Sequence, residues 1–227
     1  MTTKKTKQRM RIRILSLYIL LFMAIIPSFS QSPAHTPMRG WLIAMPDSIL
    51  PLLTPNNRLD FIDFHDANME AVVTNRMEGK SRMETLTDDF LHINSTKTTD
   101  VTMKLLPVND TTDVLCMVTT VRASVDDSRI AFFDARWQPV DAAFYIREPS
   151  LGDFRSTLQC DSAEREWSKL DIFFCTYHLS AENKDLNCML TATDYLSDED
   201  EKEMAPYVRQ EPITYRWTDG KFVRNEQ

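Results

Sequence analysis

Glycine is scarce in this chain: only four occur in 227 residues, at positions 40, 79, 152 and 220. Loops that cradle phosphate groups need clustered glycines, because the backbone N–H groups must approach the anion closely. These four glycines are far apart in the sequence. The sequence therefore argues against a nucleotide-binding loop of the P-loop or the dinucleotide-binding type, and we expect no cofactor.

Cysteine is also sparse, and its four residues match neither a zinc-knuckle spacing nor a Cys-x-x-Cys motif. They are Cys116, Cys160, Cys175 and Cys188. Four cysteines allow three different arrangements of two disulfides, and an unpaired cysteine also packs well as a small apolar residue. The sequence leaves the disulfide state open, and the spacing predicts no metal site.

Long hydrophobic runs are missing as well. The most apolar segment, Ile14–Ile26, has 13 residues, whereas a membrane-spanning helix needs about 20. Six basic residues precede this segment, Pro27 ends it, and small residues follow at Ser28 and Ser30. This pattern predicts a secretory signal peptide over residues 1–30, cleaved near Ser30–Gln31, and a periplasmic or secreted protein. A membrane anchor is the less favoured alternative.

Basic residues are few compared with acidic residues once residues 1–30 are removed. The whole chain has a net charge of −7, and loss of six basic side chains leaves 20 basic residues against 33 acidic ones, a net charge of −13. An acidic surface repels phosphate backbones and anionic lipid. We therefore expect no nucleic-acid partner and no stable membrane insertion after processing. The expected partner is an envelope protein or a glycan.

The first half of the mature chain combines helix signals with strand signals. Residues 31–40 are polar and are expected to be loose. A short helix is predicted around Ile49–Leu53, and a longer one to about Ala67 with Thr54 as N-cap and Pro55 at the first helical position, burying Leu59, Phe61 and Ile62. Apolar residues then recur at every second position, which predicts strands. The predicted strands are Glu70–Thr74, Met83–Leu86, Phe90–Ser95, Val101–Val108, Val114–Arg122 and Arg129–Arg136.

The second half begins with a linker at about residues 148–155. A helix is predicted at Ser162–Leu170 and another from Ser197 to about Val208, because each begins with a capping serine and acidic residues. The predicted strands are Asp171–His178, Leu186–Thr193, Thr214–Trp217 and Lys221–Arg224. The last two flank Asp219-Gly220, a strong signal for a two-residue hairpin turn.

The two halves resemble each other over short stretches. Val114–Thr119 resembles Leu186–Thr191, and Arg136-Trp137 resembles Arg216-Trp217. We interpret this as an internal repeat, with chance similarity between strands as the alternative. The fold class predicted is α+β: N-terminal helices followed by a curved antiparallel meander, arranged as two helix-plus-sheet repeats that share one sheet. The units are residues 41–147 and 148–227.

The repeat leads to an expectation for the cysteines. Cys116 and Cys188 would occupy equivalent positions on buried strands, and equivalent sites in two repeats need not be close enough for a disulfide. We expect both to be unpaired and buried. Cys160–Cys175 is the favoured bridge if one forms. Trp217 is expected to be substantially buried.

Several short segments resemble a known family. They are Met45–Thr54, Asn57–Asp60, Val73–Asn75, Gly79–Ser81, Leu86–Asp89 and Ser128–Val140. Together they resemble the exported Bacteroidales family called domain of unknown function 3256, well over about residues 42–147 and loosely beyond. The resemblance implies a Gram-negative envelope or secreted setting. It implies no activity, cofactor or catalytic residue.

Acidic and histidine side chains on the second predicted helix form one candidate site. Asp63, His65 and Asp66, with Asp60 one turn earlier, could ligate a divalent cation or perform acid–base chemistry. The alternative is a solvated helix face. The acidic run Asp198–Glu201 resembles a calcium site only in its charge, and the first turn of a capped helix explains it better.

Two further histidines are candidates for nucleophilic chemistry. His92 and His178 are placed on predicted strands, where either could meet a carboxylate and a serine or cysteine from elsewhere in the fold. The chain has no Gly-x-Ser-x-Gly elbow. The leading hypothesis is a non-catalytic binding or interaction module of the bacterial envelope, and the alternative is an envelope hydrolase with a dispersed Ser/Cys-His-acid site. A cleft with all three groups would favour the hydrolase.

Two remaining features concern the surface. Asp110-Thr111-Thr112 resembles an acceptor for O-glycans, which makes Thr111 a candidate acceptor. The adjacent pairs Phe132-Phe133 and Phe173-Phe174 are expected to place one ring on each face of a sheet, because neighbours on a strand point in opposite directions. One face must be core, and the other is either covered by helices or presented to a partner.

Overall fold

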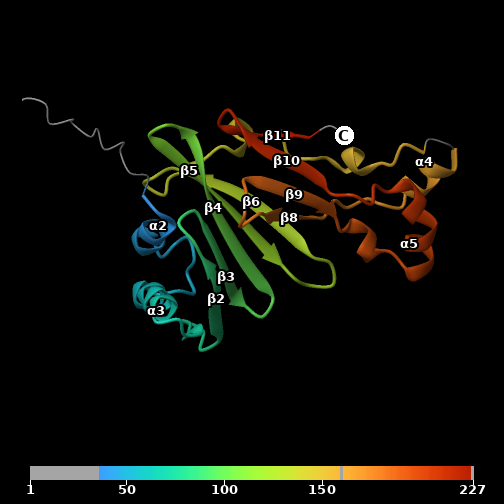
Figure 1. Ribbon diagram of the computed structural model, residues 1–227. Coiled ribbons are helices and arrows are strands. Elements are labelled where there is room, and N and C mark those ends of the chain that lie inside the picture. Colours follow the sequence, from blue (N-terminus) through green and yellow to red (C-terminus); the bar gives the residue numbers. More distant parts are fainter. Residues whose placement is uncertain (1–35, 159–160, 226–227) are drawn as a thin grey trace, which may run out of the picture. The chain divides into compact units, whose positions relative to one another are not determined.

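A seven-stranded antiparallel meander contains most of the first half of the chain (Figure 1). The computed structural model describes residues 36–158 and 161–225. In it the seven strands are neighbours in chain order. They are β1 (Ala71–Thr74), β2 (Lys80–Leu86), β3 (Phe90–Thr96), β4 (Thr99–Asn109), β5 (Thr112–Val121), β6 (Asp127–Phe133) and β7 (Pro139–Val140). Short turns suffice to join them because antiparallel neighbours need few connecting residues.

The second half forms a separate four-stranded antiparallel sheet with the order β11-β10-β9-β8. Its strands are β8 (Cys175–Leu179), β9 (Asp185–Leu190), β10 (Ile213–Thr218) and β11 (Lys221–Arg224). The β10–β11 turn has positive φ at both central residues, 50° at Asp219 and 75° at Gly220. This is the two-residue hairpin predicted from the sequence, and its left-handed residues match the twist of the strands.

Two helices cover one face of the large sheet: α2 (Met38–Ala44) and α3 (Pro55–Asp66). The α3 helix begins with a reciprocal cap, in which the Asn57 N–H donates to the Thr54 hydroxyl and the Thr54 N–H donates to the Asn57 side chain, both at 3.0 Å. This cap satisfies backbone donors that have no partner within the helix.

The other face of the large sheet packs against the four-stranded sheet. The strict alternation of a strand separates the two cores. On β5, Val114, Cys116 and Val118 point into the core between the sheets, whereas Leu115 and Met117 point toward the helices. The adjacent rings of Phe132 and Phe133 divide in the same way, as predicted.

The other helices within residues 36–158 and 161–225 follow β7 along the chain. They are α4 (Asp161–Trp167), α5 (Asp198–Met204) and four short 3-10 helices, η1 (Ala142–Phe144), η2 (Leu151–Phe154), η3 (Ala192–Tyr195) and η4 (Ala205–Tyr207). Trp167 of α4 and Met204 of α5 are buried in the core between the sheets. This core therefore extends beyond the strands into α4 and α5.

The α+β class and the six strands expected in the first half are confirmed. The strands lie in two sheets, however, and do not share one sheet as the repeat suggested. Residues 148–174 intervene between the two meanders without adding a strand to either sheet. The second Phe pair, Phe173-Phe174, precedes β8 and so has no strand to divide its rings.

The helix expected around Ile49–Leu53 was wrong, because residues 47–53 form turns. Pro51 has no N–H to donate and restricts the residue before it, which disfavours a helix there. The first described helix is α2, which begins at Met38 within the expected lead-in. On α3, Arg58 is buried in place of Leu59, which is 45% exposed, because the Arg58 guanidinium binds Asp47 and the Leu53 carbonyl.

The two tryptophans of the suggested repeat lie in different environments. Trp137 has a φ of 59° in the turn before β7 and packs against Trp41 on the helix side of the sheet. Trp217 lies on β10, is half-buried against the core between the sheets, and donates from its indole nitrogen to the Pro107 carbonyl at 2.7 Å. The correspondence between Arg136-Trp137 and Arg216-Trp217 therefore does not extend to their positions in the fold.

Cys116 and Cys188 are free and buried, as predicted. Cys175 is also free and buried. Its expected partner, Cys160, lies outside the described residues, as does the signal-peptide segment 1–30. Burial of the Cys116 side chain raises the pKa of its thiol well above the ordinary value, which keeps the thiol neutral.

Packing between the sheets can be tested at Phe132, which is 1% exposed. We expect Phe132→Ala to lower the free energy of unfolding by about 3–5 kcal/mol, because it removes buried apolar surface and leaves a cavity. Phe144→Ala is the control: Phe144 is 73% exposed, and a change below about 0.5 kcal/mol is expected. Urea unfolding followed by circular dichroism measures both. Equal effects would contradict the assigned core.

Candidate functional site

A row of polar side chains crosses the large sheet on the face that meets the small sheet. Backbone register places Asn94, Asp100, Thr120 and Ser128 side by side on four adjacent strands, β3 to β6. Apolar residues become more frequent in the following rows of the same face, as in the row of Phe90, Lys104, Cys116 and Phe132. The face that forms the core is therefore polar at one end.

The polar end of this face lies against the edge strand β8 of the small sheet, whereas the other end of β4 contacts β10, where Trp217 donates to the Pro107 carbonyl. The beginning of β4 and the end of β5 are where the polar residues lie, and they border a cavity against β8 and η3.

We call this space the Asp100 cavity, and its volume is about 270 Å³. Its walls come from β3, β4, the end of β5 and the following loop, β8, β9's C-terminal flank and η3. The lining residues are His92, Asp100, Thr102, Thr120, Arg122, Asp126, Thr176, Tyr177, His178, Leu179, Thr191 and Asp194. Most are polar, so the cavity suits a small polar ligand.

Asp100 is the most buried acidic group of the cavity, with 6% of the residue exposed. Its Oδ2 forms an ion pair with Arg122 Nη2. Its Oδ1 is buried and has no hydrogen-bond partner among the described residues. The His92 Nε2 atom lies 3.9 Å from it, beyond hydrogen-bond range. Because a buried oxygen without a partner loses its hydration uncompensated, this carboxylate is suited to accept a bond from a ligand or from a shifted His92.

The structure places two of the predicted site residues, His92 and His178, among the residues that line this cavity. His92 lies on β3 of the large sheet and His178 on β8 of the small sheet. Threonine hydroxyls accompany them, but neither a serine nor a cysteine is among the residues that line the cavity. The cavity therefore contains imidazoles and carboxylates without the serine or cysteine that the hydrolase hypothesis requires.

The other candidates, Asp63, His65 and Asp66, lie on α3, which covers the opposite face of the large sheet. Asp66 binds Arg39 through two contacts of 2.5 and 2.7 Å, and this pairing lowers the pKa of Asp66 to about 2. His65 Nδ1 is 3.6 Å from Asp66. Asp66 is thus held by an arginine on α2, in keeping with the alternative of a solvated helix face.

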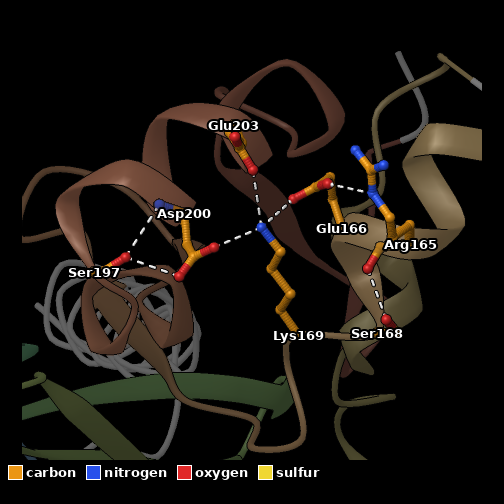
Figure 2. Close-up of polar contacts among 7 residues, drawn as sticks. All are labelled: Arg165, Glu166, Ser168, Lys169, Ser197, Asp200 and Glu203. Carbon is orange, nitrogen blue, oxygen red and sulfur yellow. Dashed lines mark hydrogen bonds and ion pairs between the residues drawn. The ribbon is translucent and has the colours of Figure 1, made fainter.

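Among residues 36–158 and 161–225, no group of three or more histidine, cysteine or acidic side chains has the arrangement of a metal site. The acidic run at the start of α5 has a structural role instead: Ser197 caps the helix by accepting from the Asp200 N–H at 3.2 Å. Figure 2 shows Lys169 reaching from the end of α4 to three carboxylates, Glu166 at 2.6 Å, Asp200 at 2.5 Å and Glu203 at 3.0 Å. This Lys169 cluster ties α5 to α4.

Thr111, the candidate O-glycan acceptor, lies in the β4–β5 turn and is exposed. Its hydroxyl donates to the Asn109 side chain at 3.0 Å. The turn is on the surface, where a modifying enzyme could reach the hydroxyl. Thr111 is therefore accessible for O-glycosylation.

Sequence reasoning missed Asp100, Arg122 and the cavity threonines. Their one sequence signal is a break in the strand pattern: along the core face of β4 the apolar Leu106 gives way to Lys104, Thr102 and Asp100. A polar residue at a core-facing position indicates either a functional site or the end of the covered region. Which strands lie opposite these residues could not be read from the pattern.

Comparison with known proteins agrees with this architecture. The sequence matches the family described as "Protein of unknown function (DUF3256)" over residues 30–222. The chain belongs to this family. It also resembles a solved structure from Porphyromonas gingivalis W83, described as a domain of an uncharacterized protein, with 28% identity and a TM-score of 0.75 over 84% of this chain and 98% of that one. No curated protein matches the chain.

These matches confirm the family resemblance seen in the sequence and extend it into the second half of the chain. The solved relative comes from a Bacteroidales bacterium, in agreement with the expected group. Within the described residues, none of the helices has the length and apolar character needed to cross a membrane. None of these findings assigns an activity to the DUF3256 family.

The Lys169 cluster yields a pH-dependent prediction. Lys169 lowers the pKa values of Glu166 and Asp200 by hydrogen bonding. A carboxyl with a lowered folded pKa stabilises the fold above its unfolded pKa, about 4, and that stabilisation is lost as the pH falls through the folded value. The pKa of Lys169 is raised, so its own contribution persists until well above about pH 10.

We therefore expect Lys169→Met to lower the thermal midpoint at pH 7, with the difference from wild type shrinking between about pH 5 and about pH 3. Lys202→Met on α5 serves as the control. Lys202 is exposed, and its substitution should cause little change at either pH. Differential scanning calorimetry measures the midpoints. A constant difference across the pH range would show that the cluster does not stabilise the contact between α4 and α5.

Proposed function

We propose that this DUF3256 protein is an exported, non-catalytic binding or interaction module of the bacterial envelope. Its partner is an envelope protein or glycan that is held at the Asp100 cavity. The observation that supports this most directly is the buried Asp100 carboxylate, one oxygen of which has no hydrogen-bond partner and borders a cavity of about 270 Å³. This volume is slightly below the usual range for small-ligand sites, about 300–1,000 Å³.

The composition of the cavity favours binding over hydrolysis. A nucleophilic mechanism needs an activated hydroxyl or thiol beside a base that is oriented by a third group. Here the base and the acid are present in His92 and Asp100, but the lining provides no serine or cysteine. A hydrolase with a dispersed site is the alternative, and threonine hydroxyls near His92 are the groups it would have to use.

Export is supported by the sequence of residues 1–30 alone. We expect the mature protein to begin at Gln31 and to be recovered from the periplasm or the medium, because the apolar segment is shorter than a membrane-spanning helix. Intact-mass spectrometry of the protein purified from fractionated cells tests this. Recovery of a chain that retains residues 1–30, or recovery in the cytoplasm, would contradict export.

Binding at the cavity can be tested by blocking its mouth. His178 is exposed at the cavity rim, so His178→Trp should obstruct entry without disturbing the core. We expect wild-type protein to retain a protein or glycan from an envelope fraction, and His178→Trp to retain at least about tenfold less, since loss of about 1.4 kcal/mol in binding corresponds to that factor. Affinity capture with mass spectrometry and glycan analysis provides the measurement.

The matched control is His65→Trp, the same substitution on the exposed surface of α3. This variant should retain the same component as wild type. If both variants bind as wild type does, the cavity is not the binding site. If the protein instead releases cleaved peptides or new reducing ends from the envelope fraction, and His92→Ala abolishes the release, the hydrolase alternative is correct.

A further inference from the structure

The charges around the Asp100 cavity are unbalanced. Three carboxylates line it, from Asp100, Asp126 and Asp194, against the single guanidinium of Arg122. These four groups together have a net charge of −2. Because Arg122 already pairs with Asp100 Oδ2, the remaining carboxylate oxygens are left to attract positive charge from elsewhere.

Each of these three carboxylates has at least one oxygen without a strong partner among the described residues. Asp100 Oδ1 is buried and unpaired. The Asp126 side chain is half-buried and has no hydrogen bond or ion pair with any residue in the described ranges. Asp194 has only a distant contact of 3.4 Å from the neighbouring Thr193 hydroxyl. A cationic donor in the cavity would satisfy oxygens that the fold itself leaves without partners.

The remaining lining groups favour hydroxyls around that cation. Thr102 and Thr176 each contribute a hydroxyl, which can both donate and accept a hydrogen bond. The imidazoles of His92 and His178 add ring nitrogens that can form hydrogen bonds with hydroxyl groups. The Arg122 guanidinium is half exposed and can donate hydrogen bonds to hydroxyl oxygens of a ligand. A ligand with several hydroxyl groups meets all of these requirements at once.

We propose that the Asp100 cavity binds an amino sugar: one sugar ring with an ammonium group directed at the Asp100 and Asp126 carboxylates. The His92 ring lies near Asp100 Oδ1 and must shift to admit the ammonium group. The cavity volume suits one sugar ring and leaves little room for a long chain. This inference rests on the proposed binding function and specifies the chemical class of its ligand.

Glucosamine and glucose form a matched pair of probes because they differ only in an amino group replacing one hydroxyl. Titration of the purified protein, followed by NMR of labelled backbone amides, should show saturable shifts at cavity residues with glucosamine. We expect binding of glucose to be at least about tenfold weaker, because it cannot form the charge-assisted hydrogen bond.

Two variants localise the ammonium site. Asp100→Asn and Asp126→Asn keep the shape of each side chain and remove its charge, and each should weaken glucosamine binding about tenfold or more. Asp63→Asn on the opposite face of the sheet is the control and should bind as wild type does. Since Asp126 lies in a loop and is only half-buried, its variant remains informative even if Asp100→Asn fails to fold.

The outcomes separate this inference from the proposed function. Equal binding of glucose and glucosamine at the cavity would overturn the cationic class while supporting a binding site. If neither sugar causes shifts, the amino-sugar inference is overturned as well. The proposed binding function would still be supported if the wild-type protein retains an envelope component and His178→Trp does not. Unchanged affinity in both Asp100→Asn and Asp126→Asn would refute the placement of the ammonium group.

Discussion

Both faces of the seven-stranded sheet are covered, the first by α2 and α3 and the second by the four-stranded sheet, and the rest of the structure depends on this arrangement. Each central strand must supply apolar side chains in both directions. β5 does so with Leu115 and Cys116, neighbours that lie in different cores and are both fully buried. Burial of one large apolar side chain contributes about 1.5–3 kcal/mol to the free energy of unfolding. Many such side chains are buried in the two cores of this sheet.

The candidate site lies where the face of the large sheet that meets the small sheet changes from apolar to polar. Leu106 and Val114 lie in the core between the sheets, whereas Asp100 and Thr120, on the same face of the same strands, line the cavity. Polar residues replace apolar ones there, and Asp100 is buried at the boundary with Arg122 as its counterion.

Polar contacts connect parts of the chain that are distant in sequence. Lys104 is only 2% exposed; its ammonium binds Asp89 at 2.9 Å and the Ala181 carbonyl at 3.2 Å, which joins the large sheet to the β8–β9 turn. The Lys169 cluster connects α4 and α5 in a similar way (Figure 2). Each lysine ammonium binds carboxylate or carbonyl oxygens on two different elements, and these directional contacts fix how the elements are positioned.

Membership of the DUF3256 family and likeness to the Porphyromonas structure support the fold over most of the chain. Neither assigns a ligand. The features that specify chemistry here are local ones: a carboxylate oxygen without a partner among the described residues, an excess of negative charge and two imidazoles in the lining of one cavity. These features are read from the structure of this chain and do not depend on its membership of the family.

The sequence by itself determined the α+β class, the strands of the first half and the last hairpin, because alternation and turn residues such as Asp219-Gly220 act over a few neighbouring positions. It also marked His92 and His178 as candidates. Only the tertiary structure decided that these two histidines share a cavity while His65 lies on the other side of the sheet. The physical reason is that β3 and β8 belong to different sheets, and how two sheets pack depends on contacts between residues nearly 90 positions apart, which no local pattern records.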